Sequence, residues 1–319
     1  MFLSFEKSIE DKAKKLDELR VFAAERQLDL SGEIDRMQGE IDSELREIYT
    51  HLTVLQKVQV ARHPNRPNCL EYVSLMVDDF VELHGDRLYR DDAAIVGGLG
   101  KIAGHPVMII GSQKGRGIED SIMRNFGMGH PEGYRKALRL MKLADRFNVP
   151  IISFIDTAGA YPGLGAEERG QGEAIARNLL EMFDISSPII AVVIGEGGSG
   201  GALALGVGNQ VLMLENSYYS VISPEGAASI LFKDSSRVEE VAKCLQIDSE
   251  SLRANGVVDE IIPEPIGGAH RRKEEMAENI KQVFVKYLEM YKSKSVQEIR
   301  DERYMKFRKM GNQFINGIK

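Results

Sequence analysis

Apolar residues recur every three or four positions near the start of the chain, and this spacing predicts helices. It is clearest from Ile34 to Leu55, where successive apolar positions are 3, 4, 4, 3, 4 and 3 residues apart. A stretch from Ile9 to Ala23 indicates another helix, with Ser31-Gly32 as the expected break between the two. Residues 1–62 are therefore expected to form an N-terminal helical arm, either a hairpin or one long kinked helix. We expect it to cover a flank of the core or a subunit interface.

From residue 93 the pattern changes to short apolar runs bounded by glycine. The runs at residues 94–99 and 106–110, joined by Ala103-Gly104-His105, predict a β-hairpin. Further strands are expected at residues 150–155, 188–194, 210–214 and 218–222, and helices at residues 131–147, 166–182, 201–206 and 224–232. Strands that alternate with helices predict an α/β fold with mostly parallel pairing.

The prolines in the segment at residues 63–68 disfavour helix and end the arm. We divide the chain there, into the arm at residues 1–62 and a main domain at residues 63–319. Residues 271–291 form a charged amphipathic pattern, which predicts a helix that packs on a neighbour. The main domain thus carries a C-terminal helical extension from about residue 269.

Composition narrows the function classes. With 319 residues, 43% of them hydrophobic and 28% charged, the chain is long enough for a sizeable core. Its net charge of −7 argues against a nucleic-acid binder that relies on bulk phosphate attraction. No apolar run approaches the roughly 20 residues that span a bilayer, and the start lacks the order of a secretory signal. We expect a cytoplasmic protein that binds neither membrane nor nucleic acid.

Cysteine and histidine are too few or too scattered to predict a metal site in this chain. Cys69 and Cys244 form no CxxC pair and cannot supply a disulfide framework or a four-cysteine zinc site. Both sit beside apolar residues and are expected to be buried. The six histidines show neither HxH nor HxxxH spacing.

Glycine is the one unusual component: 23 of the 31 glycines lie between Gly85 and Gly208. Two glycine loops stand where a predicted strand passes into a helix, at residues 156–165 and 195–201. The N-terminus of a helix presents free backbone N–H groups and the positive end of the helix dipole. Such a turn suits a phosphate or an oxyanion, and glycine lets the ligand approach the backbone.

The second loop fits several patterns at once. Gly195-x-Gly197-x-x-Gly200, with Glu215 twenty residues beyond Gly195, fits a dinucleotide-binding fingerprint. Gly197-x-Ser199-x-Gly201, followed by His270, fits the nucleophile elbow of a serine hydrolase. A Walker-type phosphate loop is excluded because the loop has no lysine. A purely structural turn and a backbone oxyanion site are the other two interpretations, and the residues alone leave all four open.

Longer strings resemble the family of bacterial acetyl-CoA carboxylase carboxyltransferase α subunits over nearly the whole chain. Besides the two glycine loops, they are residues 59–67 (QVARHPNRP), 85–87 (GDR), 91–98 (DDAAIVGG), 124–128 (RNFGM), 131–141 (PEGYRKALRLM), 220–226 (SVISPEG) and 262–270 (IPEPIGGAH). The resemblance implies a crotonase-like fold, a spiral of β-β-α units in which strand-to-helix turns supply oxyanion holes.

The same resemblance implies a reaction and its partners. A carboxyl group would pass from carboxybiotin, held on a biotin carboxyl carrier protein, to acetyl-CoA and give malonyl-CoA for fatty acid biosynthesis. The chain would work with a β subunit as α2β2, beside biotin carboxylase, and the zinc would belong to the β subunit. Backbone donors would stabilise the negative charge on the biotin ureido oxygen.

By analogy with related carboxyltransferases, we place the biotin donors at Gly200, Gly201 and Ala202. The turn containing Gly159, Ala160, Tyr161 and Gly163 forms the second wall. Lys114 and Arg116 flank Gly115 in a basic stretch and are candidates for binding substrate phosphates.

Two other functions remain as alternatives to a carboxyltransferase. One is a crotonase-like serine hydrolase that uses Ser199. The other is a non-catalytic scaffold for the β subunit.

Overall fold

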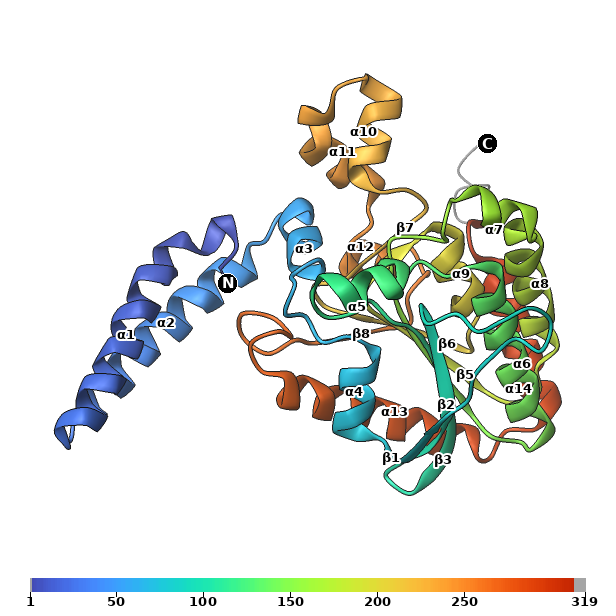
Figure 1. The fold of residues 1–319 in the computed structure, drawn as a ribbon, viewed down its shortest axis with the longest axis horizontal. Coiled ribbons are helices and arrows are strands. Elements are labelled where there is room, and N and C mark those ends of the chain that lie inside the picture. The colour runs from blue at the N-terminus through green and yellow to red at the C-terminus, as the bar shows by residue number, and fades with distance from the viewer. Residues whose placement is uncertain (1, 313–319) are drawn as a thin grey trace.

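The computed structural model describes residues 2–312. Its N-terminal arm is a helical hairpin that projects from the body (Figure 1). After a short 3-10 turn, η1 (Ser4–Glu6), helix α1 (Lys7–Arg26) packs on α2 (Ser31–Thr50). The hairpin is thus confirmed, but the expected break is misplaced. Gln27 ends α1 in a left-handed conformation, whereas Ser31-Gly32 already belongs to α2.

Two buried charges tie this end of the chain to the body. Glu6 is fully buried and accepts hydrogen bonds from Arg271 (2.7 Å) and Tyr49 (3.0 Å). Farther along, Arg66 and Glu264 form a buried bidentate pair at 2.5 and 3.0 Å. The arm and the segment that follows it are therefore fixed by specific partners near the far end of the sequence.

An eight-stranded sheet forms the centre of the body (Figure 1). Strand β2 pairs antiparallel with both β1 and β3, and all the other strand pairings are parallel. The order is β1-β2-β3-β4-β5-β6-β8, and β7 pairs with β5. The strands are β1 (Asp78–Glu82), β2 (Ile95–Ile102), β3 (His105–Ser112), β4 (Ile151–Thr157), β5 (Ile189–Gly198), β6 (Gln210–Leu214), β7 (Tyr218–Ser220) and β8 (Glu260–Ile262). The predicted α/β class with mostly parallel pairing is confirmed.

The predicted β-hairpin is confirmed as β2 and β3. Ile102 pairs with His105, and the two residues between them, Ala103 and Gly104, both have positive φ, at 48° and 81°. Two positive φ angles give the turn a twist that matches the twist of the strands.

Helices cover both faces of the sheet. On one face, α4 (Cys69–Met76) and α13 (Lys273–Tyr291) pack on alternate residues such as Ile109, Ile152 and Val192. On the other, α6 (Pro131–Arg146), α8 (Gln171–Asp184) and α9 (Ser199–Gly206) pack on Met108, Ile151 and Val193. The remaining helices are α3 (Val54–Ala61), α5 (Gly117–Met123), η2 (Asn125–Gly127), α7 (Leu164–Glu168), α10 (Pro224–Phe232), η3 (Ser235–Arg237), α11 (Val238–Leu245), α12 (Ser249–Ala254) and α14 (Val296–Lys309). None of the helices in residues 2–312 is long and apolar enough to cross a membrane.

Two predictions of local structure were wrong, the single helix at residues 166–182 and the burial of Cys244. The helix expected at residues 166–182 is two helices, α7 and α8, because Gly170 adopts a left-handed φ of 80° between them. The helix expected at residues 271–291 is confirmed as α13, which packs on α4 and β8 with Phe284 at its buried face. Cys69 is buried as expected, but Cys244 is exposed because it lies on the outer side of α11.

Candidate functional site

The two glycine loops meet where β4 and β5 end. Thr157 pairs with Gly197, so the strand ends lie side by side. A Cβ atom on Gly198 would run into the backbone of Ala158. One on Gly201 would lie 2.6 Å from the carbonyl carbon of Gly159 and 2.7 Å from the nitrogen of Ala160. Glycine is required at both positions because one backbone passes directly over the other.

Some backbone N–H groups of the first loop already donate hydrogen bonds within the fold, and others do not. Gly159 donates to the hydroxyl of Thr157 at 3.2 Å, and Tyr161 donates to the carbonyl of Gly129 at 3.0 Å. The N–H of Ala160 has no acceptor among residues 2–312. Gly163 precedes α7, and its carbonyl accepts from Ala166 at 2.9 Å. Of the predicted wall residues, Ala160 and Gly163 have N–H groups without an acceptor among the described residues, and Ala160 is the one that lies against Gly201.

The second loop places the start of α9 against this donor. Ser199, Gly200 and Gly201 form the first turn, where N–H groups have no acceptor inside the helix. Ser199 has a positive φ of 49°, which turns the chain sharply from β5 into α9. The structure therefore brings Gly200, Gly201 and Ala202 together with Gly159 and Ala160.

A cavity of about 410 Å³ adjoins the first loop. Its wall includes Ala158 of that loop, and both predicted cations, Lys114 and Arg116, line it. Glu196 and Asp156, at the ends of β5 and β4, lie at its base. The site thus combines backbone donors with a group of buried charges.

Lys114 neutralises the two acidic side chains. Its ammonium lies 2.8 Å from Asp156 and 2.5 Å from Glu196. Burial opposes ionisation of Glu196, but Lys114, the hydroxyl of Tyr218 and the guanidinium of Arg62 outweigh it and lower the pKa of Glu196 to about 2. Glu196 is therefore a carboxylate at neutral pH.

Arg62 joins this cluster to the protruding helix pair α10–α11 (Figure 1). Its guanidinium lies 2.7 Å from Glu196 and 2.6 Å from Glu225, which lies in the first turn of α10. The same side chain donates to the hydroxyl of Tyr218 at 3.1 Å. Burial opposes the charge of Arg62, but its partners raise its pKa overall.

Arg116 is also engaged by its own chain. Its guanidinium donates to the carbonyls of Pro64 and Arg66 and to the carboxylate of Glu71. The two predicted phosphate-binding cations thus lie in one cavity, but each already has anionic or carbonyl partners within the fold.

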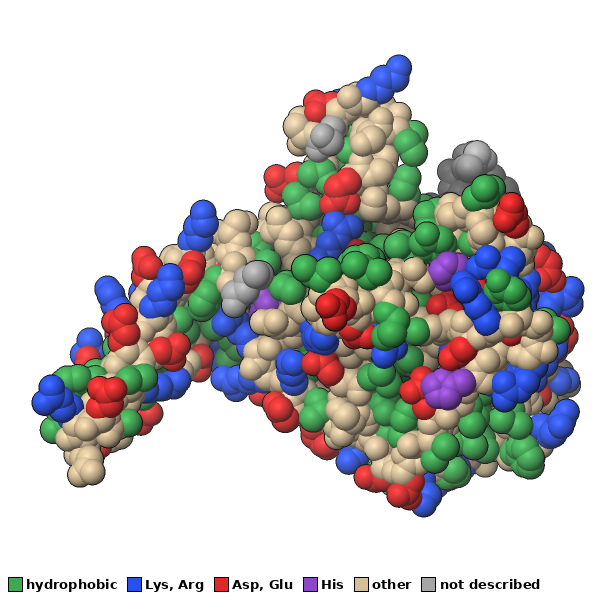
Figure 2. All heavy atoms as spheres, in the orientation of Figure 1, with side chains coloured by type: hydrophobic (Ala, Val, Ile, Leu, Met, Phe, Trp, Pro, Cys, Tyr) green, Lys and Arg blue, Asp and Glu red, His purple; other side chains and the backbone are tan. Residues whose placement is uncertain are grey.

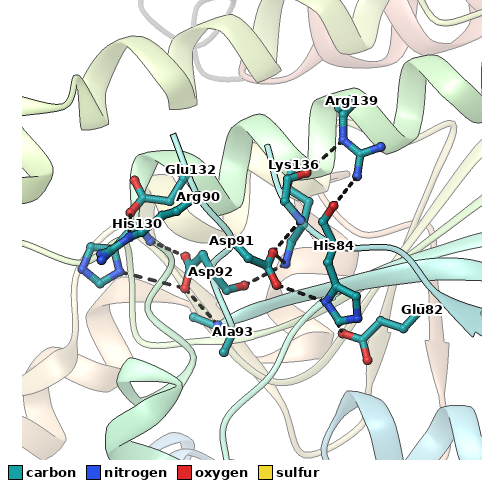
Figure 3. Close-up of polar contacts among 12 residues, drawn as sticks. Glu82, His84, Arg90, Asp91, Asp92, Ala93, His130, Glu132, Lys136 and Arg139 are labelled. Atoms are coloured by element: carbon teal, nitrogen blue, oxygen red, sulfur yellow. Dashed lines mark hydrogen bonds and ion pairs between the residues drawn. The ribbon is translucent and has the colours of Figure 1, made fainter. Parts of the chain in front are cut away.

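A second polar network connects Asp91 and Asp92 with Lys136 and His130 (Figure 3). Asp92 accepts from the backbone N–H of His130 at 2.7 Å, and the His130 ring packs on Tyr161 with centroids 4.4 Å apart. Lys136 is buried and bonds Asp91 at 2.5 Å and the carbonyl of Asp92 at 2.8 Å. Asp92 therefore holds His130, the residue on which Tyr161 rests, and Lys136 holds Asp91 and Asp92 in turn.

Sequence reasoning missed Asp156, Glu196 and Arg62. One signal was present: Asp156 and Glu196 each follow an apolar strand and precede a glycine loop. Parallel strands bring such positions together at the carboxyl edge of a sheet. Nothing local indicated that Arg62 and Lys114 would meet them there.

The structure does not assemble the serine hydrolase alternative. Ser199 faces an apolar cavity of about 290 Å³ with Leu203, Tyr219 and Phe307, and no histidine lines it. His270 instead stacks on His63, with ring centroids 3.8 Å apart.

The structure also argues against the dinucleotide-binding alternative, because the acidic residue of that pattern already has a partner. Glu215 is held by the backbone N–H of Glu264 at 3.0 Å, within the fold. Within residues 2–312, no group of three or more His, Cys, Asp and Glu side chains is arranged to hold a metal ion.

Comparison of the sequence with known proteins gives the family. A family model described as acetyl co-enzyme A carboxylase carboxyltransferase-like matches residues 2–311. The acetyl-coenzyme A carboxylase carboxyl transferase subunit alpha of Fusobacterium nucleatum is 56% identical over 309 residues, which cover 97% of this chain and 99% of the relative. The subunit of the same name from Halalkalibacterium halodurans is 54% identical, over 97% of this chain and 95% of the relative.

Solved structures show the same fold in more distant proteins. The transcarboxylase 12S structure with bound methylmalonyl-coenzyme A aligns with a TM-score of 0.59 and 21% identity, over 73% of this chain and 44% of that one. The β subunit of geranyl-CoA carboxylase from P. aeruginosa aligns with a TM-score of 0.55 and 18% identity, over 79% of this chain and 45% of that one. This likeness confirms the predicted crotonase-like fold. The chain therefore belongs to the acetyl-CoA carboxylase carboxyltransferase α-subunit family, and it is the α-type part of an enzyme that transfers carboxyl groups.

Proposed function

We propose that this chain forms the carboxybiotin-facing half of the carboxyltransferase site, and that a β subunit completes the site for acetyl-CoA. The observation that carries the proposal is the junction of the two glycine loops. There the free N–H of Ala160 lies beside the first turn of α9, where Gly200 and Gly201 present further donors. Two backbone donors from different strands form the geometry of an oxyanion hole.

Carboxybiotin, when bound, supplies the carboxyl group and takes up negative charge on its ureido oxygen. Ala160 and the start of α9 donate hydrogen bonds to that oxygen, and the dipole of α9 adds to their effect. Preorganised donors of this kind need no reorganisation during the reaction, and loss of one typically costs about 3 kcal/mol. Carboxyl transfer therefore needs no catalytic triad in this chain.

The buried charges beside the loops position the backbone. Lys114 joins the ends of β4 and β5 through Asp156 and Glu196, and Arg62 ties Glu196 to α10. We assign Lys114 and Arg116 to holding these loops, since each is already satisfied within the fold. Binding of substrate phosphates by either cation would require it to release a partner.

Exposed apolar side chains beside the cavity offer a docking surface for the β subunit. Ile118, Ile122 and Met123 on α5 are 79, 59 and 58% exposed, and Phe126 just beyond is 54% exposed. Figure 2 shows these hydrophobic side chains gathered over α5, near the base of the protruding α10–α11 pair. An apolar surface of this kind next to an incomplete site is suited to a permanent partner.

The remaining assignments follow from membership of the family. We place the chain in an α2β2 assembly in the cytoplasm, with zinc on the β subunit, where it works with the biotin carboxyl carrier protein and biotin carboxylase. The product is malonyl-CoA, the first committed intermediate of fatty acid biosynthesis.

The test is reconstitution with a β subunit from the same organism. Biotin-dependent decarboxylation of malonyl-CoA is followed for the mixture and for each subunit alone. The proposal predicts turnover only in the mixture. Full activity of the β subunit alone would indicate a scaffold instead. Reaction of Ser199 with a serine-directed phosphonate would indicate a hydrolase.

A further inference from the structure

A second cavity of about 550 Å³ lies between α6 and α8, and no residue of the glycine loops lines it. Four basic residues on one helix, Arg135, Arg139, Lys142 and Arg146, line this groove. Their spacings of 4, 3 and 4 residues place them on one face of α6. Lys and Arg side chains are numerous on this side of the molecule (Figure 2).

Three of these cations lack an acidic partner. Arg135, Arg139 and Arg146 form no ion pair with a carboxylate in residues 2–312, whereas Lys142 lies 2.9 Å from Glu181. Arg139 instead donates to the carbonyls of Gly85 and His84, at 3.0 and 3.2 Å (Figure 3). Burial and the nearby charge of Arg87 lower the pKa of Arg139. Asp86 and Glu173 are the acidic residues of the groove wall, against five basic ones, so positive charge is in excess there.

The same groove holds two buried acceptors without donors. Asp86 and Asn178 are 4 and 1% exposed and both line the cavity. Oδ1 of Asp86 accepts from Leu88 and Tyr89, but its Oδ2 has no partner among the described residues. The amide nitrogen of Asn178 donates to Tyr134 and Ala204, while its Oδ1 also lacks a partner. Buried acceptors without donors are rare in folded proteins, and each needs an explanation.

The rest of the wall includes apolar Leu138, Leu143 and Ala174, together with Glu173 and Arg177 of α8, which pair with each other at 2.6 Å. A ligand for this groove thus needs anionic groups that pair with the arginines and hydrogen-bond donors for Asp86 Oδ2 and Asn178 Oδ1. It also needs a flat or apolar body between them. Arginine is suited to phosphate because its fork of donors matches phosphate oxygens. The volume is within the range of small-molecule sites.

We propose that the α6–α8 groove binds a phosphate ester of nucleotide size, with its phosphate on Arg135, Arg139 and Arg146. Its hydroxyl or amino groups donate to Asp86 and Asn178. The chemistry is shared by free nucleotides and by the nucleotide end of coenzyme A. The site does not depend on the oxyanion assignment, because the two sets of lining residues do not overlap.

Isothermal titration calorimetry of the full chain tests the proposal, with adenosine 5′-monophosphate, coenzyme A, adenosine and inorganic phosphate as probes. We expect at least one of the first two to bind, and adenosine to bind about tenfold or more weakly, since a charge-assisted pair to phosphate is lost. Binding of coenzyme A alone identifies its nucleotide end as the ligand, and binding of the monophosphate identifies a free nucleotide.

The variant R135Q/R146Q removes two of the cations that lack an acidic partner and leaves the carbonyl contacts of Arg139 in place, although it also removes the hydrogen bond from Arg135 to the carbonyl of Arg169. Its dissociation constant should rise at least about tenfold, while R36Q, on the exposed arm, should bind as the wild type does. Circular dichroism confirms folding of each variant. No binding of either nucleotide at millimolar concentration, or equal binding by R135Q/R146Q, would overturn the proposal and leave a groove filled by water.

Discussion

The backbone nitrogen of Ala160 lies 2.7 Å from where a Cβ atom of Gly201 would stand. Two turns from neighbouring parallel strands thus touch with no room for a side chain between them. Because Gly159 and Tyr161 use their own N–H groups within the fold, Ala160 is the unoccupied donor of the first turn that lies beside Gly201. This relationship narrows the proposed oxyanion site to Ala160 and the first turn of α9.

His270 should make the protein sensitive to acid at mild pH. Burial, with the charges of His63 and two nearby arginines, lowers the pKa of His270 to about 2, and neither ring nitrogen has a partner among the described residues. The unfolded chain binds a proton below about pH 6.5, but the folded chain does not. Stability is therefore lost as pH falls below 6.5, by roughly 2 kcal/mol at pH 5.

His270→Phe keeps a flat ring against His63 and removes this titration. Urea unfolding at pH 7 and pH 5 should show a smaller loss of stability in the variant than in the wild type. An equal loss in both proteins would mean that His270 titrates normally.

Glu196 should act in the same sense as His270, but at lower pH. Its folded pKa of about 2 lies below the ordinary value of 4.5, so its contribution is complete above pH 4.5 and is lost as pH falls towards 2. The shift corresponds to a free energy on the order of 3 kcal/mol. E196Q should unfold more readily at pH 7 and lose less stability between pH 4.5 and pH 3, measured by urea titration. A variant as stable as the wild type at pH 7 contradicts the role of the Lys114–Glu196 pair.

Lys114→Met should affect turnover more than binding. Without the ammonium, Asp156 and Glu196 repel each other and the two loops separate, and displacement by about 1 Å can cost on the order of a hundredfold in rate. We expect kcat of the reconstituted enzyme to fall at least about tenfold, with KM for malonyl-CoA nearly unchanged. Lys12→Met, which breaks an exposed pair on the arm, is the matched control. A higher KM with an unchanged kcat would instead support the earlier interpretation that Lys114 binds a substrate phosphate.

Breaking the Arg66–Glu264 pair should lower the free energy of unfolding strongly. Both side chains are almost fully buried, so Arg66→Met leaves an unpaired carboxylate and should destabilise the fold by about 3–5 kcal/mol. The double variant R66M/E264Q should recover part of that loss, since no buried charge remains. Denaturant unfolding of both variants measures the difference, and equal stability of the single and double variants would show that the charge is not the cause.

Much of the architecture could be predicted from the sequence because the signals are local. The hairpin turn at Ala103-Gly104, the apolar run of β5 and the proline at the start of α6 each act over a few residues. The split between α7 and α8 was missed because Gly170 lies inside a continuous helical pattern, where glycine is often tolerated.

The site was harder to predict because its parts are far apart in the chain. The glycine loops indicated backbone donors, but not that Gly159 and Tyr161 are already occupied. Arg62 and Glu196 are 134 residues apart in sequence and meet only when the segment after α3 packs on β5. Nor can the groove between α6 and α8 be recognised before the whole fold is known, because only the fold shows that Asp86 and Asn178 have an acceptor without a donor and that three arginines lack an acidic partner.

The most direct measurement compares G201A and G200A in the reconstituted α–β complex. A Cβ atom at position 201 strikes the backbone of Gly159 and Ala160, whereas one at position 200 meets only the flexible side chain of Ile175 at 3.6 Å. The account predicts that biotin-dependent malonyl-CoA decarboxylation falls about a hundredfold in G201A and stays near the wild-type rate in G200A, with both complexes assembled. Wild-type turnover by G201A, or an equal loss in both variants, would contradict it.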